Sequence, residues 1–207
     1  MIEIAITAKS FGDRPVLGPI RFDIAPGETV AVTGPSGIGK STLLRIVAGI
    51  DTEFEGHVTT PPRIAMVFQE PTLLPWRSVL QNLTLVHPEL GDDAARARLD
   101  RVGLADKAGD FPGQLSLGQQ RRLALARAFA GAPELLILDE PFVSLDKTTA
   151  ETMLGLTEAL IAETRPATLF VTHAAAEARR LATRTLALRG SPATLAPHPV
   201  ETKGVKP

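Results

Sequence analysis

Residues 34–42, GPSGIGKST, carry the clearest pattern of chemistry in the 207-residue sequence. They match G-x-x-x-x-G-K-[ST] and stand between a strand-like run, TVAVT, and a helix-like run, LLRIVAGI. In such a loop, glycines let backbone N–H groups face phosphate oxygens, the lysine binds the β- and γ-phosphates, and the next hydroxyl ligates Mg²⁺. The alternative is a glycine-rich turn with a solvated lysine, which the length and context of the motif disfavour. The predicted nucleotide-binding residues are Gly34, Pro35, Ser36, Gly37, Ile38, Gly39, Lys40, Ser41 and Thr42.

Two carboxylates end the apolar run LLILDE, residues 135–140. A strand that ends in Asp139 can deliver this side chain to Mg²⁺, and Glu140 can then orient an attacking water. Acidic residues also follow buried strands simply as loop or cap residues, so the run alone leaves both interpretations open. Its pairing with Lys40 in the same predicted sheet favours phosphoryl transfer.

The segment LSLGQQRRLALARAFAG, residues 115–131, has two interpretations. Ser116, with Gln119 three residues later, has the spacing of a capping box at the start of a helix. Gly118 lowers helix stability, and a helix N-terminus with adjacent serine and glycine is also a place where backbone N–H groups bind an anion. The residues alone leave open whether the segment is a cap or an anion clamp.

The elements that must position these residues follow from apolar periodicity. Residues 2–6 and 20–24 alternate apolar and polar side chains, which predicts half-buried antiparallel strands. The runs TVAVT, RIAMVF, LLILDE and TLFVTH are compact and apolar, which is typical of strands in a sheet covered on both faces. With a helix after residue 40, this order predicts an α/β core that follows a β-rich start.

Helical patterns replace strand patterns between MVFQ and LLILD, in SVLQNLTLV, DDAARARLDRVGL and GQQRRLALARAFAG. We expect a single domain over residues 1–190, with a helical subdomain, 71–133, inserted into a nucleotide-binding core, 1–70 and 134–190. The last stretch, GSPATLAPHPVETKGVKP, contains four prolines and little apolar content. This composition predicts a disordered tail over residues 191–207.

Bulk composition narrows the classes of partner. The chain has 22 basic and 23 acidic residues, and this net charge of −1 gives no electrostatic reason to expect nucleic acid. It has no cysteine, which excludes disulfides and thiolate metal sites. The N-terminus lacks the features of a signal peptide, and no apolar run approaches the ~20 residues of a membrane span. We therefore expect any connection to a membrane to go through a partner.

The order of these motifs resembles that of ATP-binding-cassette (ABC) transporter ATPases over residues 1–190, because LSLGQQ precedes the acidic strand and SLD and VTH follow it. The resemblance implies a P-loop NTPase (RecA-like) α/β core with an N-terminal antiparallel β subdomain and an inserted helical subdomain. It also implies ATP hydrolysis with Mg²⁺. Gln69 of VFQE is then the Q-loop residue that serves Mg²⁺ and catalysis, Asp146 belongs to the nucleotide-binding D-loop, and His173 is the switch histidine at the γ-phosphate.

Phe11 stands where the family usually carries a tyrosine that stacks on adenine. An aromatic ring of either type can stack on a base, so the resemblance implies that Phe11 binds the nucleotide. The alternative is that Phe11 packs under the N-terminal strands.

The resemblance further implies a second copy of the chain. In the family, two subunits meet head to tail, and LSGGQ of one closes over ATP held by the other. Ser116, Gly118 and Gln119 would then bind the partner's ATP. The same helix N-terminus would therefore serve both as the capped helix start and as the anion clamp. Leu117 departs from the motif, which has glycine there, and its side chain must point away from the phosphate.

As a family member, the chain would be the ATP-hydrolysing subunit on the inner face of the cell membrane, driving a transmembrane permease. LLPW, residues 73–76, resembles ATPase subunits of nitrate, sulfonate and taurine importers, which act with an external solute-binding protein. These residues could line a groove for a permease helix, or Trp76 could equally anchor the core of the helical subdomain. The alternative function is a soluble ABC ATPase that acts on nucleic acid or ribosomes, but such proteins usually carry two cassettes or a long insert.

Overall fold

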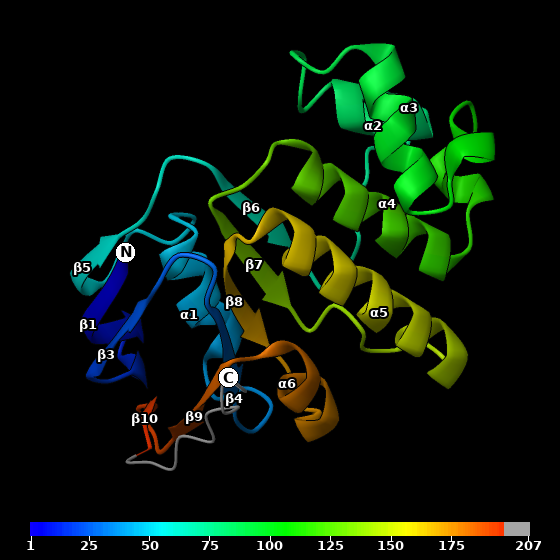
Figure 1. The fold of residues 1–207 in the computed structure, drawn as a ribbon. Helices are drawn as coiled ribbons and strands as arrows, with labels where there is room; N and C mark the ends of the chain where they lie inside the picture. The colour runs from blue at the N-terminus through cyan, green and yellow to red at the C-terminus, as the bar shows by residue number, and fades with distance from the viewer. Residues whose placement is uncertain (197–207) are drawn as a thin grey trace, which may run out of the picture. The chain divides into compact units, whose positions relative to one another are not determined.

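The computed structural model describes residues 1–196, which form two compact units (Figure 1). The first unit comprises Met1–Met66, Glu134–Glu140 and the described chain from Arg165 onward, and the second comprises Val67–Pro133 and Pro141–Thr164. The second unit includes the expected helical subdomain, 71–133, and also a long helix further along the chain. No helix among the described residues is both long and apolar enough to span a membrane.

The first unit begins with an antiparallel sheet of four strands. These are β1 (Ile2–Phe11), β2 (Arg14–Leu17), β3 (Ile20–Ile24) and β5 (Glu55–Thr59), and β1 pairs with each of the other three. Ile2, Ile4 and Ile6 of β1 are buried while Glu3 is exposed. The alternation in the sequence therefore corresponds to one buried and one more exposed face, as predicted.

The second sheet of this unit has the strand order β10-β9-β4-β8-β7-β6. Its strands are β4 (Thr29–Thr33), β6 (Ile64–Val67), β7 (Leu135–Asp139), β8 (Ala167–Val171), β9 (Arg184–Arg189) and β10 (Thr194–Leu195). β4 runs parallel to β8 and β9, and β7 runs parallel to β8. The carboxyl ends of β4, β7 and β8 therefore meet at one edge of the sheet, where open α/β sheets bind their ligands.

Two helices accompany these sheets, α1 (Lys40–Val47) and α6 (Ala175–Leu181). α1 lies between the two sheets (Figure 1), and its buried Leu43, Leu44 and Val47 join one hydrophobic cluster with residues of both. Because this cluster holds α1 on both sides, the first residues of the helix are fixed against the carboxyl end of β4. The expectation of an α/β P-loop core with an antiparallel β subdomain is confirmed.

The structure of residues 191–196 differs from the prediction of a disordered tail. Residues 191–196 were expected to be disordered, but Thr194 pairs with Arg189 and Leu195 with Leu188, antiparallel to β9. The Ala193 N–H donates to the Val16 carbonyl at 2.9 Å, and its carbonyl accepts from Gly18 at 2.8 Å. Composition misled here because a two-residue strand on a sheet edge is stabilised by backbone hydrogen bonds to distant segments, which no local pattern reveals. The rest of the predicted tail, 197–207, lies outside the described residues.

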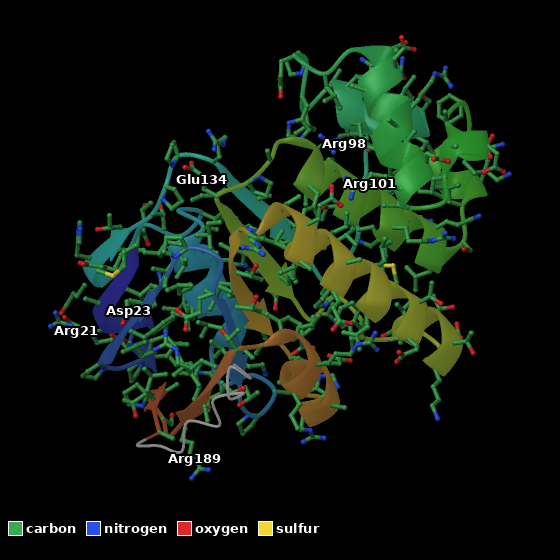
Figure 2. All side chains as sticks on the ribbon, in the orientation of Figure 1. Arg21, Asp23, Arg98, Arg101, Glu134 and Arg189 are labelled. Atoms are coloured by element: carbon green, nitrogen blue, oxygen red, sulfur yellow. The ribbon has the colours of Figure 1, made fainter. Side chains whose placement is uncertain are left out.

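The second unit is helical, with α2 (Val79–Thr84), α3 (Asp92–Arg101), two 3₁₀ turns (Ala105–Lys107 and Pro112–Gln114), α4 (Leu117–Ala130) and α5 (Lys147–Thr164). Its core includes Val79, Leu83, Leu99 and Leu123, all fully buried. An ion pair between Arg101 and Glu163 joins α3 to α5 within this unit, and Figure 2 labels Arg101.

Candidate functional site

The loop between β4 and α1 has the backbone shape that phosphate binding requires. Gly34, Gly37 and Gly39 have φ values of 152°, 75° and 114°, which side-chain-bearing residues rarely adopt. A Cβ atom at Gly39 would also lie 2.7 Å from Cδ2 of Leu17. Gly39 is the N-cap of α1 and makes no side-chain cap, so the helix N-terminus is free of an intramolecular side-chain acceptor at this position. Such a terminus favours an anion.

Lys40 points back into this loop. Its side chain is only 4% exposed, and Nζ donates hydrogen bonds of 3.0 Å to the carbonyls of Gly34 and Pro35. Nζ also lies 3.6 Å from Oε1 of Glu140. The ammonium is therefore held at the mouth of the loop by neutral acceptors and one carboxylate, where it can bind a phosphate group.

Ser41 and Asp139 form the second element of the site. Ser41 Oγ donates to Asp139 Oδ1 at 3.2 Å, although the residues lie 98 positions apart in the sequence. Burial raises the pKa of Asp139, and the hydrogen bond from Ser41 opposes this shift. Two oxygen ligands suit Mg²⁺, which usually takes one or two protein ligands and completes its shell with water and phosphate oxygens. The residues present therefore fit a magnesium ion.

Glu140 has a backbone conformation that is costly for a non-glycine residue. Its φ is 45°, and its N–H donates to the Val171 carbonyl at 3.0 Å, directly beside the end of β7. This geometry places the carboxylate between two basic groups, with Oε1 near Lys40 and Oε2 3.6 Å from Nδ1 of His173. Strained residues of this kind persist where the surrounding structure holds them, often at functional sites.

His173 follows β8 and has a side chain that is 57% exposed. The residues that hold its loop were missed by the sequence analysis. The buried Thr172 hydroxyl donates to Glu177 of α6 and accepts from the Ala174 N–H at 3.0 Å. Thr172 and Glu177 are five residues apart, which is not the three-residue spacing of a capping box, so the sequence carried no local signal for this bond. These bonds anchor the loop on both sides of His173.

Phe11, at the end of β1, is 54% exposed, so it does not pack under the N-terminal strands. Nζ of Lys9 lies 4.5 Å from the centroid of the Phe11 ring. Lys9 itself is buried, forms an ion pair with Asp51 at 2.7 Å and donates to the Glu53 carbonyl at 2.7 Å. Since the ammonium covers one face of the ring, a stacked base would need the other face. The sequence analysis did not identify Lys9.

A pocket of about 720 Å³ opens beside the phosphate loop. It is lined by residues from three segments: the β1–β2 hairpin, the loop itself and the end of β9. Arg14 and Arg189 lie at its border, and Arg189 extends outward from the end of β9 in Figure 2. The pocket is large enough for part of a nucleotide, and it lies next to the Lys40 loop.

In the second unit, Ser116 caps α4, which is one of the two interpretations that the sequence left open. Gln119 N–H donates to Ser116 Oγ at 3.3 Å, and the Gln119 side-chain oxygen accepts from Ser116 N–H at 2.8 Å. The capping box is thus complete within one chain. The serine hydroxyl accepts in this bond, so its proton is still available to an anion. Leu117 is 42% exposed and lies in the same surface segment.

Asp146 caps the other helix of this region. Its Oδ1 accepts hydrogen bonds from the N–H groups of Thr148, at 3.1 Å, and Thr149, at 3.0 Å. Hydrogen bonds from Thr149 lower the pKa of Asp146, which keeps the side chain ionised. Residues 116–119 and 144–146 both line one pocket of about 390 Å³.

Gln69, a predicted site residue, lies in the second unit. It is exposed, in the bend after β6, and its part in Mg²⁺ binding and catalysis stays a prediction.

Trp76, also in the second unit, is 67% exposed, so it does not anchor the core of the helical unit. The loop that carries Trp76 is fixed by the fully buried Asn82. The Asn82 side chain hydrogen-bonds to the backbone of Leu74, Arg77 and Ser78.

Comparisons with known proteins show the family of the chain. The family model described as "ABC transporter" matches residues 17–143. The aliphatic sulfonates import ATP-binding protein of Mycobacterium sp. (strain MCS) is 48% identical over 186 residues, which cover 87% of this chain and 76% of that protein. A protein of the same description from Frankia alni is 49% identical over 87% of this chain and 74% of its own length.

A solved structure is also similar, a dimeric ATP-binding cassette in a post-hydrolysis state with ADP and Pi. It is 28% identical in sequence, with a TM-score of 0.82, and the match covers 99% of this chain and 100% of the cassette.

Proposed function

This chain belongs to the ABC transporter family and is an ATPase, and from this we propose that it powers an importer of aliphatic sulfonates. The observation that carries the proposal is the arrangement of Glu140 between Lys40 and His173, beside the Ser41–Asp139 pair. These five side chains lie at the carboxyl ends of neighbouring parallel strands, next to a loop that can bind phosphates. The names of the relatives support aliphatic sulfonates, a class that includes taurine, as the substrate in place of nitrate.

Binding of ATP rests on the loop 34–42 and on Phe11. The backbone N–H groups of the loop and the ammonium of Lys40 would hold the phosphates, and the exposed face of Phe11 would stack on adenine. Ser41 and Asp139 would hold Mg²⁺, and a part for Gln69 in Mg²⁺ binding rests on the resemblance of VFQE to the Q-loop. The bound ion would neutralise charge on the phosphate oxygens.

Hydrolysis rests on Glu140 and His173. The Glu140 carboxylate would accept a hydrogen bond from the attacking water and align it with the γ-phosphate. In the structure this carboxylate lies near Lys40, so arrival of the phosphate would give Lys40 a second anionic partner and release Glu140 toward the water. His173, held by the Thr172 and Glu177 bonds, would contact the γ-phosphate from the end of β8.

The active state would be a homodimer. The similar dimeric cassette supports this assembly. Each chain would present the N-terminus of α4 to the ATP of its partner, with the Ser116 proton, Gly118 and Gln119 as donors and Asp146 near the interface. The complete capping box preorganises Ser116 without consuming its proton, so cap and clamp are compatible.

Coupling to transport would use the loop around Trp76. An exposed tryptophan on a loop fixed by a buried asparagine is suited to bind an apolar partner surface. We propose that this partner is a transmembrane permease, on the inner face of the membrane, which receives its solute from an external binding protein. The alternative, an ATPase acting on nucleic acid or ribosomes, is not favoured by the import function named for the relatives.

The test is a gene replacement in the source organism. Loss of the chain should abolish growth with an aliphatic sulfonate as the sulfur source and leave growth on sulfate unchanged. Wild-type protein should restore growth, and the Glu140→Gln variant should not. The tagged chain should also co-purify from detergent-solubilised membranes with a multi-span permease. Growth on sulfonate without the chain would contradict the substrate, and co-purification with ribosomal proteins would contradict the transport function.

A further inference from the structure

Gly118, the second residue of α4, has no backbone reason to be glycine. Its φ lies outside the left-handed region, and glycine is less favourable than alanine inside a helix. A Cβ atom at this position would, however, lie 2.8 Å from Cγ2 of Thr149 in α5. This distance is shorter than carbon atoms can approach without displacement, so close contact between the two helices requires glycine here.

Thr149 makes a second contact, through its backbone. Its N–H donates to Oδ1 of Asp146 at 3.0 Å. The methyl group of Thr149 thus lies toward Gly118 while its backbone N–H binds Asp146. One residue connects the start of α4 with the D-loop, residues 144–146.

Arg121 makes a parallel connection one turn further along α4. Its side chain is buried, and Nη1 donates to the Pro141 carbonyl at 3.2 Å, just before the D-loop. The same two segments line the 390 Å³ pocket described above. Residues 116–121 and 141–149 are therefore joined at two points within one unit.

We propose that Thr149 is a positioning residue for ATP-driven closure, because its methyl group meets Gly118 and its backbone N–H binds Asp146, and these two contacts set the spacing between residues 116–119 and the D-loop of the same chain. The proposal rests on the proposed function, in which both segments meet the partner's nucleotide. It assigns Gly118 a role inside its own chain, distinct from leaving room for a phosphate. A loss of turnover caused by a side chain at position 118 should therefore be reversed by a smaller side chain at position 149.

The experiment is a double-substitution cycle on the full chain. Gly118→Ala should lower ATP turnover by about tenfold or more through overpacking, while ATP affinity of the monomer is unchanged. Thr149→Ser removes the obstructing methyl group and keeps both the hydroxyl and the backbone N–H that binds Asp146. Turnover of Gly118→Ala/Thr149→Ser should therefore return to within about threefold of Thr149→Ser alone. Thr149→Val, which keeps the methyl group and loses the hydroxyl, should give no rescue.

A double variant as inactive as Gly118→Ala would overturn the proposal, because the added methyl group would then act on the phosphate rather than on Thr149. Thermal unfolding provides an independent readout if the proposed dimer itself fails to form. Gly118→Ala should lower Tm more in the wild-type background than in the Thr149→Ser background. Equal shifts of Tm in both backgrounds would refute the contact, whatever the activity of the protein.

Discussion

The carboxylate of Glu140 lies 3.6 Å from Nδ1 of His173, although these residues belong to loops after different strands. β7 and β8 are adjacent and parallel, so the residues that follow them emerge side by side. Glu140 is aimed at this point by its unusual φ of 45°. In the proposed mechanism Glu140 orients the water and His173 contacts the γ-phosphate, so the two groups that act on the reaction lie next to each other. Each residue can be tested by its own substitution.

Glu140→Gln should keep ATP binding and lose most of the turnover, because the amide cannot act as the base that orients water. The loss should be about 10²-fold or more, as for other general bases. A stable ATP-bound dimer should accumulate and be visible by light scattering after size-exclusion chromatography. Turnover at the wild-type rate would remove Glu140 from the mechanism.

Lys40→Met and His173→Ala should separate binding from activation. Loss of the Lys40 ammonium removes a charged phosphate ligand, so ATP affinity and hydrolysis should both fall. The exposed His173 contributes less to affinity, so His173→Ala should mainly lower turnover. Titration calorimetry with ATP, alongside steady-state hydrolysis, measures both effects, and an equal loss of affinity in the two variants would argue that His173 has a structural role.

Asp139→Asn should stabilise the nucleotide-free protein at neutral pH and abolish Mg²⁺-dependent hydrolysis. Burial raises the pKa of Asp139, so the folded state binds more protons than the unfolded state at pH values between the two pKa values. Stability from this group is therefore lost as pH rises through that interval. Asparagine should remove this cost while still accepting the Ser41 hydrogen bond.

The gain in Tm from Asp139→Asn should be largest near pH 7 and should vanish below the unfolded pKa, about 3.9. Thermal melts of both proteins across pH, without nucleotide, measure this. A gain that is independent of pH would show that the carboxylate's charge is not the cause.

Ser116→Asp distinguishes a clamp from a simple cap. Aspartate is a good N-cap, so the free energy of unfolding should lie within about 1 kcal/mol of the wild-type value. Its carboxylate would repel the γ-phosphate of the partner's ATP, so turnover and ATP-dependent dimerisation should be lost. Leu117→Gly is the matched control in the same segment, since it removes no donor and should keep hydrolysis. A fully active Ser116→Asp enzyme would exclude the clamp.

Much of the fold could be predicted because its signals are local. Alternating isoleucines gave the half-buried strands, and the glycine-rich motif before Lys40 gave the loop and the start of α1. The capping box of Ser116 and Gln119, one of the two interpretations of its segment, is present in the structure. Each of these rests on interactions within a few residues, where dihedral preferences and periodicity are decisive.

Other features could not be predicted from local patterns. Residues 191–196 have a disorder-like composition, yet they pair with β9 and hydrogen-bond to Val16 and Gly18. The pairing partners at Val16 and Gly18 are brought close only by the fold. Trp76 is exposed, on a loop whose backbone is hydrogen-bonded to the nearby Asn82, and the apolar character of its side chain alone could not decide between burial and exposure.

The sequence alone determined the chemical inventory of this protein: a phosphate loop with Lys40, two carboxylates after a buried strand, a capped helix start and the family to which they belong. The tertiary structure alone decided which of these groups meet. It brought Ser41 to Asp139 across 98 residues, placed Glu140 between Lys40 and His173, and packed Gly118 against Thr149. The physical reason is that residue type and short-range periodicity act along the chain, whereas strand order and helix packing determine distances across it.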